Sequence, residues 1–169
     1  MARPARLLSP PPTPGVLVAF LLVFGLVVAS AAEPLWSLMG QEAQLFSSAN
    51  DVRRQHHLGA LRTSPALAEV ALAHAQDMAR NDYLSHVNPE GQDPLQRVQA
   101  AGIEGFKLLA ENIGSSNVTD DRVLTIVEEW LRSPRHRENL LNPAFNTSGV
   151  AVVEAPNGRT LAVQLYATF

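Results

Sequence analysis

The chain contains no cysteine. Disulfides, thiolate metal sites and a cysteine nucleophile are therefore excluded, and any metal ion has to be held by His, Asp, Glu or water. The chain also lacks a basic cluster. Its 16 Asp and Glu residues outnumber its 13 Lys and Arg residues, and the formal net charge is −3. Such a chain is a poor candidate for nucleic-acid binding, and we expect no nucleic-acid partner. Hydrophobic residues reach 46%, which is enough for a packed core and argues against disorder.

The N-terminal segment has the layout of a secretory signal peptide. Arg3 and Arg6 form a short positive region, residues 15–32 are an uncharged apolar run, and Ala29-Ser30-Ala31 matches the A-x-A cleavage pattern. We predict a signal peptide at 1–31; the alternative is an uncleaved membrane anchor, which would be the chain's only contact with a membrane. In both cases the remainder is exported. Export without cysteine is typical of a bacterial secreted or cell-envelope protein.

Hydrophobic periodicity in the rest of the chain predicts helices first and strands late. Ser64-Pro65 is a helix start signal, and Pro156-Asn157-Gly158 between two apolar segments is a hairpin signal. This order predicts one α+β domain in which helices pack on an antiparallel sheet. The expected helices are 35–57, 65–81, 94–102, 120–132 and a short turn through 141; the expected strands are 108–113, 148–154 and 160–166, with loops at 82–93 and 114–119.

Three residues are the candidates for chemistry. His86 lies in a loop, His136 follows the Ser133-Pro134 break, and Glu111 stands among apolar residues, where a carboxylate is costly to bury unless it is paired or ligated. If they meet, they could hold Zn²⁺ with a position left for water, or form a hydrogen-bonded acid/base cluster without a metal. No short metal motif, nucleophile elbow, P-loop or dinucleotide fingerprint is present.

The other three histidines fit structural roles. His74 lies on the apolar stripe of the second expected helix, so we predict a hydrogen-bonded core histidine there. His56 and His57 stand at the end of the first expected helix, where the helix dipole favours a cation, and we expect them to be solvated.

A series of short motifs stands in a specific order along the chain. They are Asn50-Asp-Val-Arg53, Pro65-Ala-Leu67, His74-Ala75, Asp77-Met-Ala79, Tyr83-Leu-Ser-His86, Asn88-Pro-Glu-Gly91, Arg97 with Ala101-Gly102, Glu111-Asn-Ile113, Trp130-Leu-Arg-Ser-Pro134, His136-Arg137, Asn139-Leu-Leu-Asn-Pro143 and Gly149-Val-Ala151. Together they resemble the CAP superfamily (cysteine-rich secretory proteins, antigen 5 and pathogenesis-related 1 proteins) in its bacterial SCP-like branch. The resemblance covers nearly the whole exported part.

The resemblance implies an α-β-α sandwich with helices on both sides of a small antiparallel sheet. It places the CAP domain at 45–168 after a lead-in at 32–44. It also implies an extracytoplasmic protein with a cleft lined by two His and two Glu, to which His86, Glu111 and His136 correspond. The second Glu does not carry over, because eukaryotic members place it three residues after the helix Trp, where this chain has Ser133. Ser133 or Glu129 is the candidate to stand in for it.

Three functions stay open at this point. The first is a binding module for a small apolar or lipid ligand, with Zn²⁺ or another divalent cation at His86 and His136, as the resemblance implies. The second is a protease-like hydrolase that uses both histidines, with Glu111 as general base or as activator of a metal-bound water. The third is a structural envelope protein without a ligand. Because the second Glu and a nucleophile motif are missing, we expect binding rather than catalysis.

Overall fold

The last strand of the chain is the centre of the sheet. In a computed structural model that describes residues 35–118 and 120–169, the strand order is β1-β3-β4-β2. β4 pairs antiparallel with β2 and with β3, and β1 pairs parallel with β3. The elements in chain order are α1 (Leu35–Gln55), β1 (Arg62–Thr63), α2 (Pro65–Asn81), α3 (Pro94–Ala100), β2 (Leu108–Ser116), α4 (Arg122–Arg132), α5 (Pro134–Leu141), β3 (Thr147–Glu154) and β4 (Thr160–Thr168).

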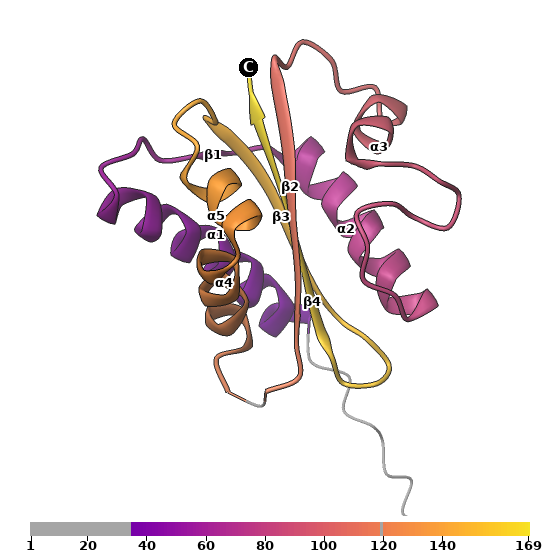
Figure 1. Cartoon of the computed structure of the whole chain (residues 1–169). Coiled ribbons are helices and arrows are strands. Elements are labelled where there is room, and N and C mark those ends of the chain that lie inside the picture. Colours follow the sequence, from indigo (N-terminus) through magenta and orange to yellow (C-terminus); the bar gives the residue numbers. More distant parts are fainter. Residues whose placement is uncertain (1–34, 119) are drawn as a thin grey trace, which may run out of the picture. The chain divides into compact units, whose positions relative to one another are not determined.

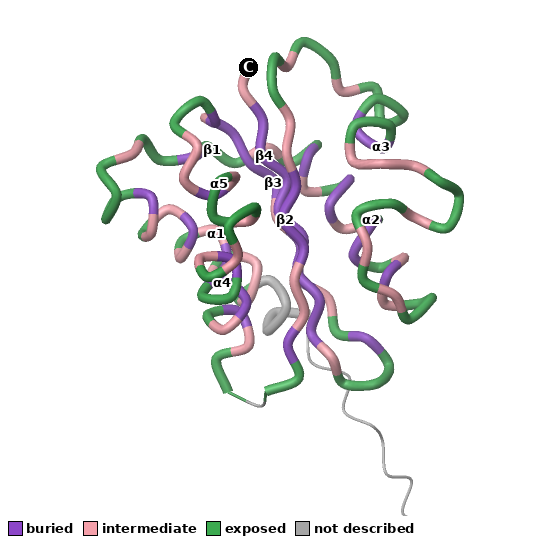
Figure 2. Tube along the Cα trace, viewed as in Figure 1, coloured by how far each residue is buried: buried purple, intermediate pink, exposed green. Residues whose placement is uncertain are grey.

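Helices cover both faces of this sheet, so the predicted α+β sandwich is confirmed. In Figure 1, α2 and α3 lie on one face, and α1, α4 and α5 lie on the other. Successive side chains of a strand point to opposite faces. Accordingly, Leu161, Val163 and Leu165 of β4 pack in the cluster with α2, whereas Ala162 packs with α4 and Tyr166 with α5. β4 is buried along almost its whole length, whereas the outer strand β2 is only partly buried, as Figure 2 shows.

Local start signals fix the two helices next to the candidate site. Ser64 accepts a hydrogen bond from the backbone N–H of Leu67, with Pro65 at the first helical position, so α2 begins where the sequence predicts. Asp93 and Gln96 form a capping box at the start of α3. The segment that carries His86 joins the end of α2 to the capped start of α3.

In the layer of α1, α4 and α5, a buried arginine joins α1 to the end of α5. Arg53 of α1 is fully buried, and its guanidinium donates to the carbonyls of Gly59, Leu140, Asn142 and Phe145. Four carbonyl acceptors satisfy the donors, so the cation is hydrogen-bonded although burial lowers its pKa. This fixes α1 against the end of α5, the helix that carries His136.

Three details differ from the sequence predictions. β1 was not expected; its pairing makes the sheet mixed instead of purely antiparallel. Residues 114–116 were expected in a loop, but they extend β2 because Gly114, Ser115 and Ser116 pair with β4. The first helix ends at Gln55, two residues early, and His57 has φ of 56°.

The prediction for the N-terminal segment rests on the sequence alone. The predicted signal peptide at 1–31 lies outside the described residues. Within the described residues, we find no helix with the length and apolar character that a membrane span needs.

Candidate functional site

Three elements bring His86, Glu111 and His136 together. His86 comes from the loop between α2 and α3, Glu111 from β2 and His136 from α5. Nδ1 of His86 lies 2.8 Å from Oε1 of Glu111, and the two imidazole rings lie 6.3 Å apart between centroids. The side chain of Glu111 is 1% exposed and that of His86 is 46% exposed. The carboxylate is thus the buried base of the cluster, and His86 is its accessible part.

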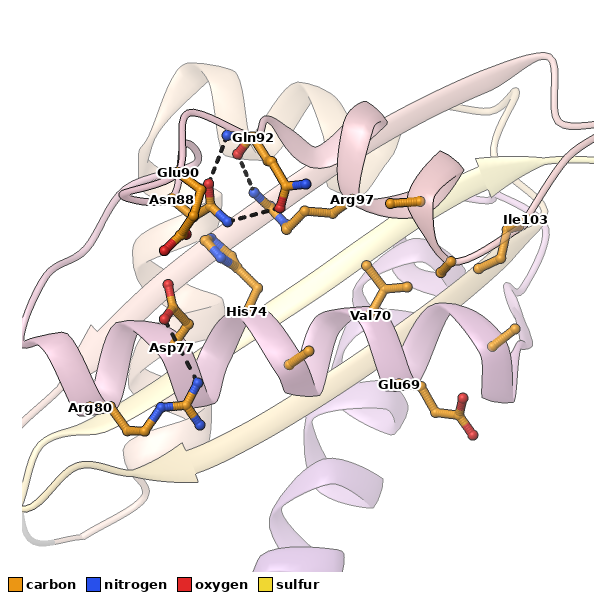
Figure 3. Close-up of a pocket in the computed structure, with 14 residues that line it drawn as sticks. Glu69, Val70, His74, Asp77, Arg80, Asn88, Glu90, Gln92, Arg97 and Ile103 are labelled. Carbon is orange, nitrogen blue, oxygen red and sulfur yellow. Dashed lines mark hydrogen bonds and ion pairs between the residues drawn. The ribbon is translucent and has the colours of Figure 1, made fainter.

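Arg97 of α3 pairs with the buried carboxylate of the cluster. Its Nη2 donates to Oε2 of Glu111 at 2.6 Å. Its Nη1 donates to the backbone carbonyls of His86, at 2.8 Å, and Gln92, at 2.9 Å, and the second bond is visible in Figure 3. One guanidinium therefore pairs with the buried carboxylate and holds the loop that presents His86. A buried charge needs this kind of paired and hydrogen-bonded partner.

This network determines which nitrogen of His86 is free. Glu111 pairs with Arg97 and acts as an acceptor, so Nδ1 of His86 is the donor in their hydrogen bond. In the neutral ring, Nε2 then keeps its lone pair. A histidine that donates one ring N–H to a carboxylate and offers the other nitrogen is the usual arrangement of a metal-binding imidazole.

Two asparagines bond to the backbone at His136 and at Glu111. Nδ2 of Asn112 donates to the backbone carbonyl of His136 at 2.9 Å, and Nδ2 of Asn139 donates to the carbonyl of Glu111 at 3.2 Å. Asn112 and Asn139 are joined by a further bond of 3.0 Å. Burial, and then the charge of nearby His86, lower the pKa of His136, so its ring is neutral at neutral pH.

The side chains of the cluster supply only some of the ligands that a metal ion needs. Both oxygens of Glu111 are engaged by His86 and Arg97, so Glu111 is not free to join a metal site. Among the residues that the structure describes, no group of three His, Asp or Glu side chains could hold a metal ion. Zn²⁺ sites usually have three or four protein ligands. His86 and His136 supply two ligands of the right chemistry, and water would have to complete the shell.

The structure shows no bond between this cluster and either of the two substitutes considered for the missing carboxylate, within the residues that it describes. Glu129 is exposed and Ser133 is half-buried. Within residues 35–118 and 120–169, neither side chain hydrogen-bonds to His86, Glu111 or His136, and Ser133 makes no side-chain cap to α5. The neighbour of Glu129 on α4, Trp130, is buried.

Sequence reasoning assigned no role to Arg97, Asn112 or Asn139, although all three belong to the motifs of the resemblance. A signal for Arg97 did exist. A carboxylate in an apolar segment needs a cation, and a short helix with an arginine in its last turn precedes Glu111. For the asparagines we see no comparable signal in the sequence.

His74 lies next to the cluster and fits the predicted core role. It is 1% exposed, and its Nε2 bonds to the carbonyl of Ser85 at 2.9 Å. A carbonyl only accepts, so Nε2 carries the proton and Nδ1 is an acceptor in the neutral ring. Burial is the main cause that lowers the pKa of His74.

We expect the lowered pKa values of His74 and His136 to make the fold sensitive to acid. Below about pH 6.5 the unfolded chain binds protons that the folded chain does not, so the free energy of unfolding falls as pH falls. One such proton contributes up to about 1.4 kcal/mol per pH unit. Urea unfolding of wild type and His74→Gln between pH 7.5 and 5 tests this, because Gln keeps a donor for Ser85 and removes the titration.

The expected result is a flatter pH dependence in His74→Gln than in wild type. His56→Gln is the control, since His56 is exposed beyond the end of α1. Equal slopes in wild type and His74→Gln would contradict this account of His74.

Comparisons with known proteins agree with the fold and the motifs. A family model described as "CAP: Cysteine-rich secretory protein family" matches residues 46–166. The uncharacterized protein YkwD of Bacillus subtilis is 32% identical over 119 residues, which cover 70% of this chain and 45% of YkwD. This chain therefore spans less than half the length of that curated relative.

Solved structures show the same architecture. An extracellular protein containing a SCP domain from Bacillus anthracis has a TM-score of 0.70 and 29% identity, covering 83% of this chain and 45% of that one. NaASP2, described with Zn²⁺, has a TM-score of 0.54 and 14% identity, covering 79% and 82% of the two chains, and so shares the fold. Because the family model spans most of the chain, this protein belongs to CAP, the cysteine-rich secretory protein family.

Proposed function

We propose that this protein is an exported binding module that holds a divalent metal ion between His86 and His136 and takes a small apolar ligand nearby. The observation that carries the proposal is the bond of 2.8 Å between Nδ1 of His86 and the buried carboxylate of Glu111. It leaves Nε2 of His86 as a free ligand atom beside a second imidazole. Burial keeps that second ring, His136, neutral, and a neutral ring is the form that binds metal.

A hydrolase is the second candidate, because a histidine oriented by a carboxylate is also the arrangement of a general base. Such an enzyme needs a nucleophile or an activated water. In the described part of the chain no hydroxyl group hydrogen-bonds to the ring of His86 or His136, and the sequence has no cysteine. Glu111 is also occupied by Arg97. These observations favour binding over catalysis.

Export is part of the proposal. It rests on the positive, apolar and small-residue segments of 1–31. The similar protein from Bacillus anthracis is described as extracellular, which agrees with it. Zn²⁺ is the expected ion, because imidazole nitrogen suits it and because NaASP2 has the same fold and is described with this ion.

Calorimetric titration with Zn²⁺ at pH 7.5 tests the metal site. We expect one site in the wild type, and a loss of affinity of more than about 100-fold in His86→Ala and in His136→Ala. The reason is that each change removes one of two protein ligands, which costs more than the 10–100-fold typical of an outer partner. His56→Ala, which removes an exposed histidine, is expected to bind like wild type.

The outcomes separate the candidates. Absence of binding heat in the wild type would overturn the metal site, and so would equal losses in His56→Ala and His86→Ala. Turnover of a peptide or ester that disappears in His136→Ala would instead favour the hydrolase.

A further inference from the structure

A cavity of about 500 Å³ lies between α2, α3 and the segment that precedes α3, next to the His/Glu cluster. This volume is within the range of small-molecule sites, about 300–1,000 Å³. Figure 3 shows its lining, with His74 rising from α2 towards Asn88 and Gln92, and Val70 and Ile103 farther along. Arg97 is part of this wall and also bonds to Glu111, so it separates the cavity from the metal site proposed above.

Apolar side chains, mainly alanines, line much of the cavity. Small side chains on the facing parts of α2 and α3 leave the space open. The apolar lining residues are Ala66, Val70, Ala73, Ala100, Ala101 and Ile103.

Two residues of the lining, His74 and Arg97, each hold a buried polar atom that lacks a protein partner. Nδ1 of His74 and Nε of Arg97 are buried and make no hydrogen bond to any described residue. Nδ1 of His74 is an acceptor, because Nε2 donates to Ser85, whereas Nε–H of Arg97 is a donor. Buried polar groups are normally paired, so each atom calls for a partner.

The charges of the lining as a whole argue against an anionic ligand. The guanidinium of Arg97 is neutralised by Glu111, and Arg80 lies 3.7 Å from Asp77. Glu69 and Glu90 also line the cavity, and within the described residues neither forms an ion pair. The lining is therefore negative overall, and an anion would be repelled.

We propose that this cavity binds an uncharged amphipathic molecule with a hydroxyl or primary amide head group and a short alkyl tail. A hydroxyl or amide both donates and accepts, so it can pair with His74 and with Arg97 through a small shift of the wall. A carboxylate only accepts and an ammonium only donates, so each leaves one atom unpaired. The tail lies over the alanines. This inference names the site and the class of small ligand, and it rests on the proposed binding function.

An NMR titration with three probes of equal chain length tests the proposal: octanol, octanamide and octanoate at pH 7.5. We expect amide shifts in α2 and α3 with octanol and octanamide. Octanoate should bind at least about tenfold more weakly, because the negative lining repels it and because it leaves a buried group unpaired. Failure of both uncharged probes at millimolar concentration, or equal binding of octanoate, would overturn it.

Two variants fill the cavity from opposite walls. Ala73→Phe on α2 and Ala100→Phe at the end of α3 are each expected to abolish octanamide binding. Gln76→Phe, which places the same aromatic ring at another exposed position of α2 outside the lining, is the matched control and is expected to bind as wild type does. Loss in Gln76→Phe equal to that in Ala73→Phe, or retained binding in both filling variants, would contradict the assignment.

The same variants keep this test apart from the test of the metal site. Ala73 and Ala100 do not belong to the His/Glu cluster, so Zn²⁺ binding should persist when octanamide binding is lost. Normal Zn²⁺ binding without any amphiphile binding overturns the cavity alone, whereas absent Zn²⁺ binding bears on the proposed metal site.

Discussion

Replacing Arg97 by methionine is expected to lower the free energy of unfolding by about 3–5 kcal/mol at pH 7, the cost typical of removing one partner from a buried ion pair. Methionine fills similar space but leaves the carboxylate of Glu111, 1% exposed, without its cation. The carbonyls of His86 and Gln92 lose their donor in the same change. Urea unfolding followed by circular dichroism measures the loss.

A double-mutant cycle separates the unpaired charge from lost packing. Arg97→Met combined with Glu111→Leu removes both charges, and replacing a whole buried pair by apolar residues is often nearly neutral. We therefore expect the double variant to be more stable than Arg97→Met. Arg80→Met is the control, because its pair with Asp77 is 3.7 Å long and the arginine is 66% exposed, so a loss below about 1 kcal/mol is expected. Additive losses in the double variant would show that the pair contributes nothing specific.

The loss should extend to the metal site. Arg97 bonds to the carbonyl of His86 and also fixes the carboxylate that orients its ring. Weaker Zn²⁺ binding in Arg97→Met, at a urea-free condition where the variant is folded, would identify Arg97 as a positioning residue.

Local signals predicted the elements where local chemistry decides them. α2 begins at Pro65 because Ser64 and Pro65 favour a helix start whatever the surroundings, and the apolar stripe of α2 is buried as its spacing predicts. β1 has only two residues, and both are exposed. Their pairing depends on where β3 lies, so no periodicity could indicate it. Residues 114–116 look like a loop in isolation, and only their register with β4 makes them a strand.

In the candidate site, too, local patterns predicted some features and tertiary contacts decided the others. Spacing could not group His86, Glu111 and His136, because three separate elements carry them; the motifs of the resemblance suggested the grouping. The bond of Arg97 to Glu111 depends on how α3 packs on β2, and this is a tertiary contact without a local pattern. Glu129, considered as a replacement for the missing carboxylate, is exposed on α4 and stays a prediction as a member of the site. The burial of its neighbour Trp130 does not decide this, because the successive residues Ile126 and Val127 of the same helix are both buried.

Gly149 is expected to be the least tolerant glycine among the residues that the structure describes. A Cβ added there would lie 2.2 Å from the backbone nitrogen of Ala68 and 2.3 Å from the carbonyl carbon of Leu67. These backbone atoms belong to the first turns of α2, so relief requires the helix to move away from β3. Overpacking a core usually costs about 1–3 kcal/mol. Because backbone cannot rotate aside, we expect Gly149→Ala to lose about 3 kcal/mol or more.

Two other glycines make this a graded test. A Cβ at Gly114 would meet side-chain atoms of Ile126 at 2.6 Å and Trp130 at 2.9 Å, which can partly yield, so Gly114→Ala should lose less. At Gly59 nothing lies within 4 Å, and alanine there should be neutral or stabilising by up to about 1 kcal/mol. Thermal and urea unfolding of the three variants give the order, and a Gly149→Ala protein as stable as Gly59→Ala would contradict the close packing of α2 on β3. Since α2 carries His74 and one wall of the cavity, the same displacement should weaken octanamide binding even where Gly149→Ala stays folded.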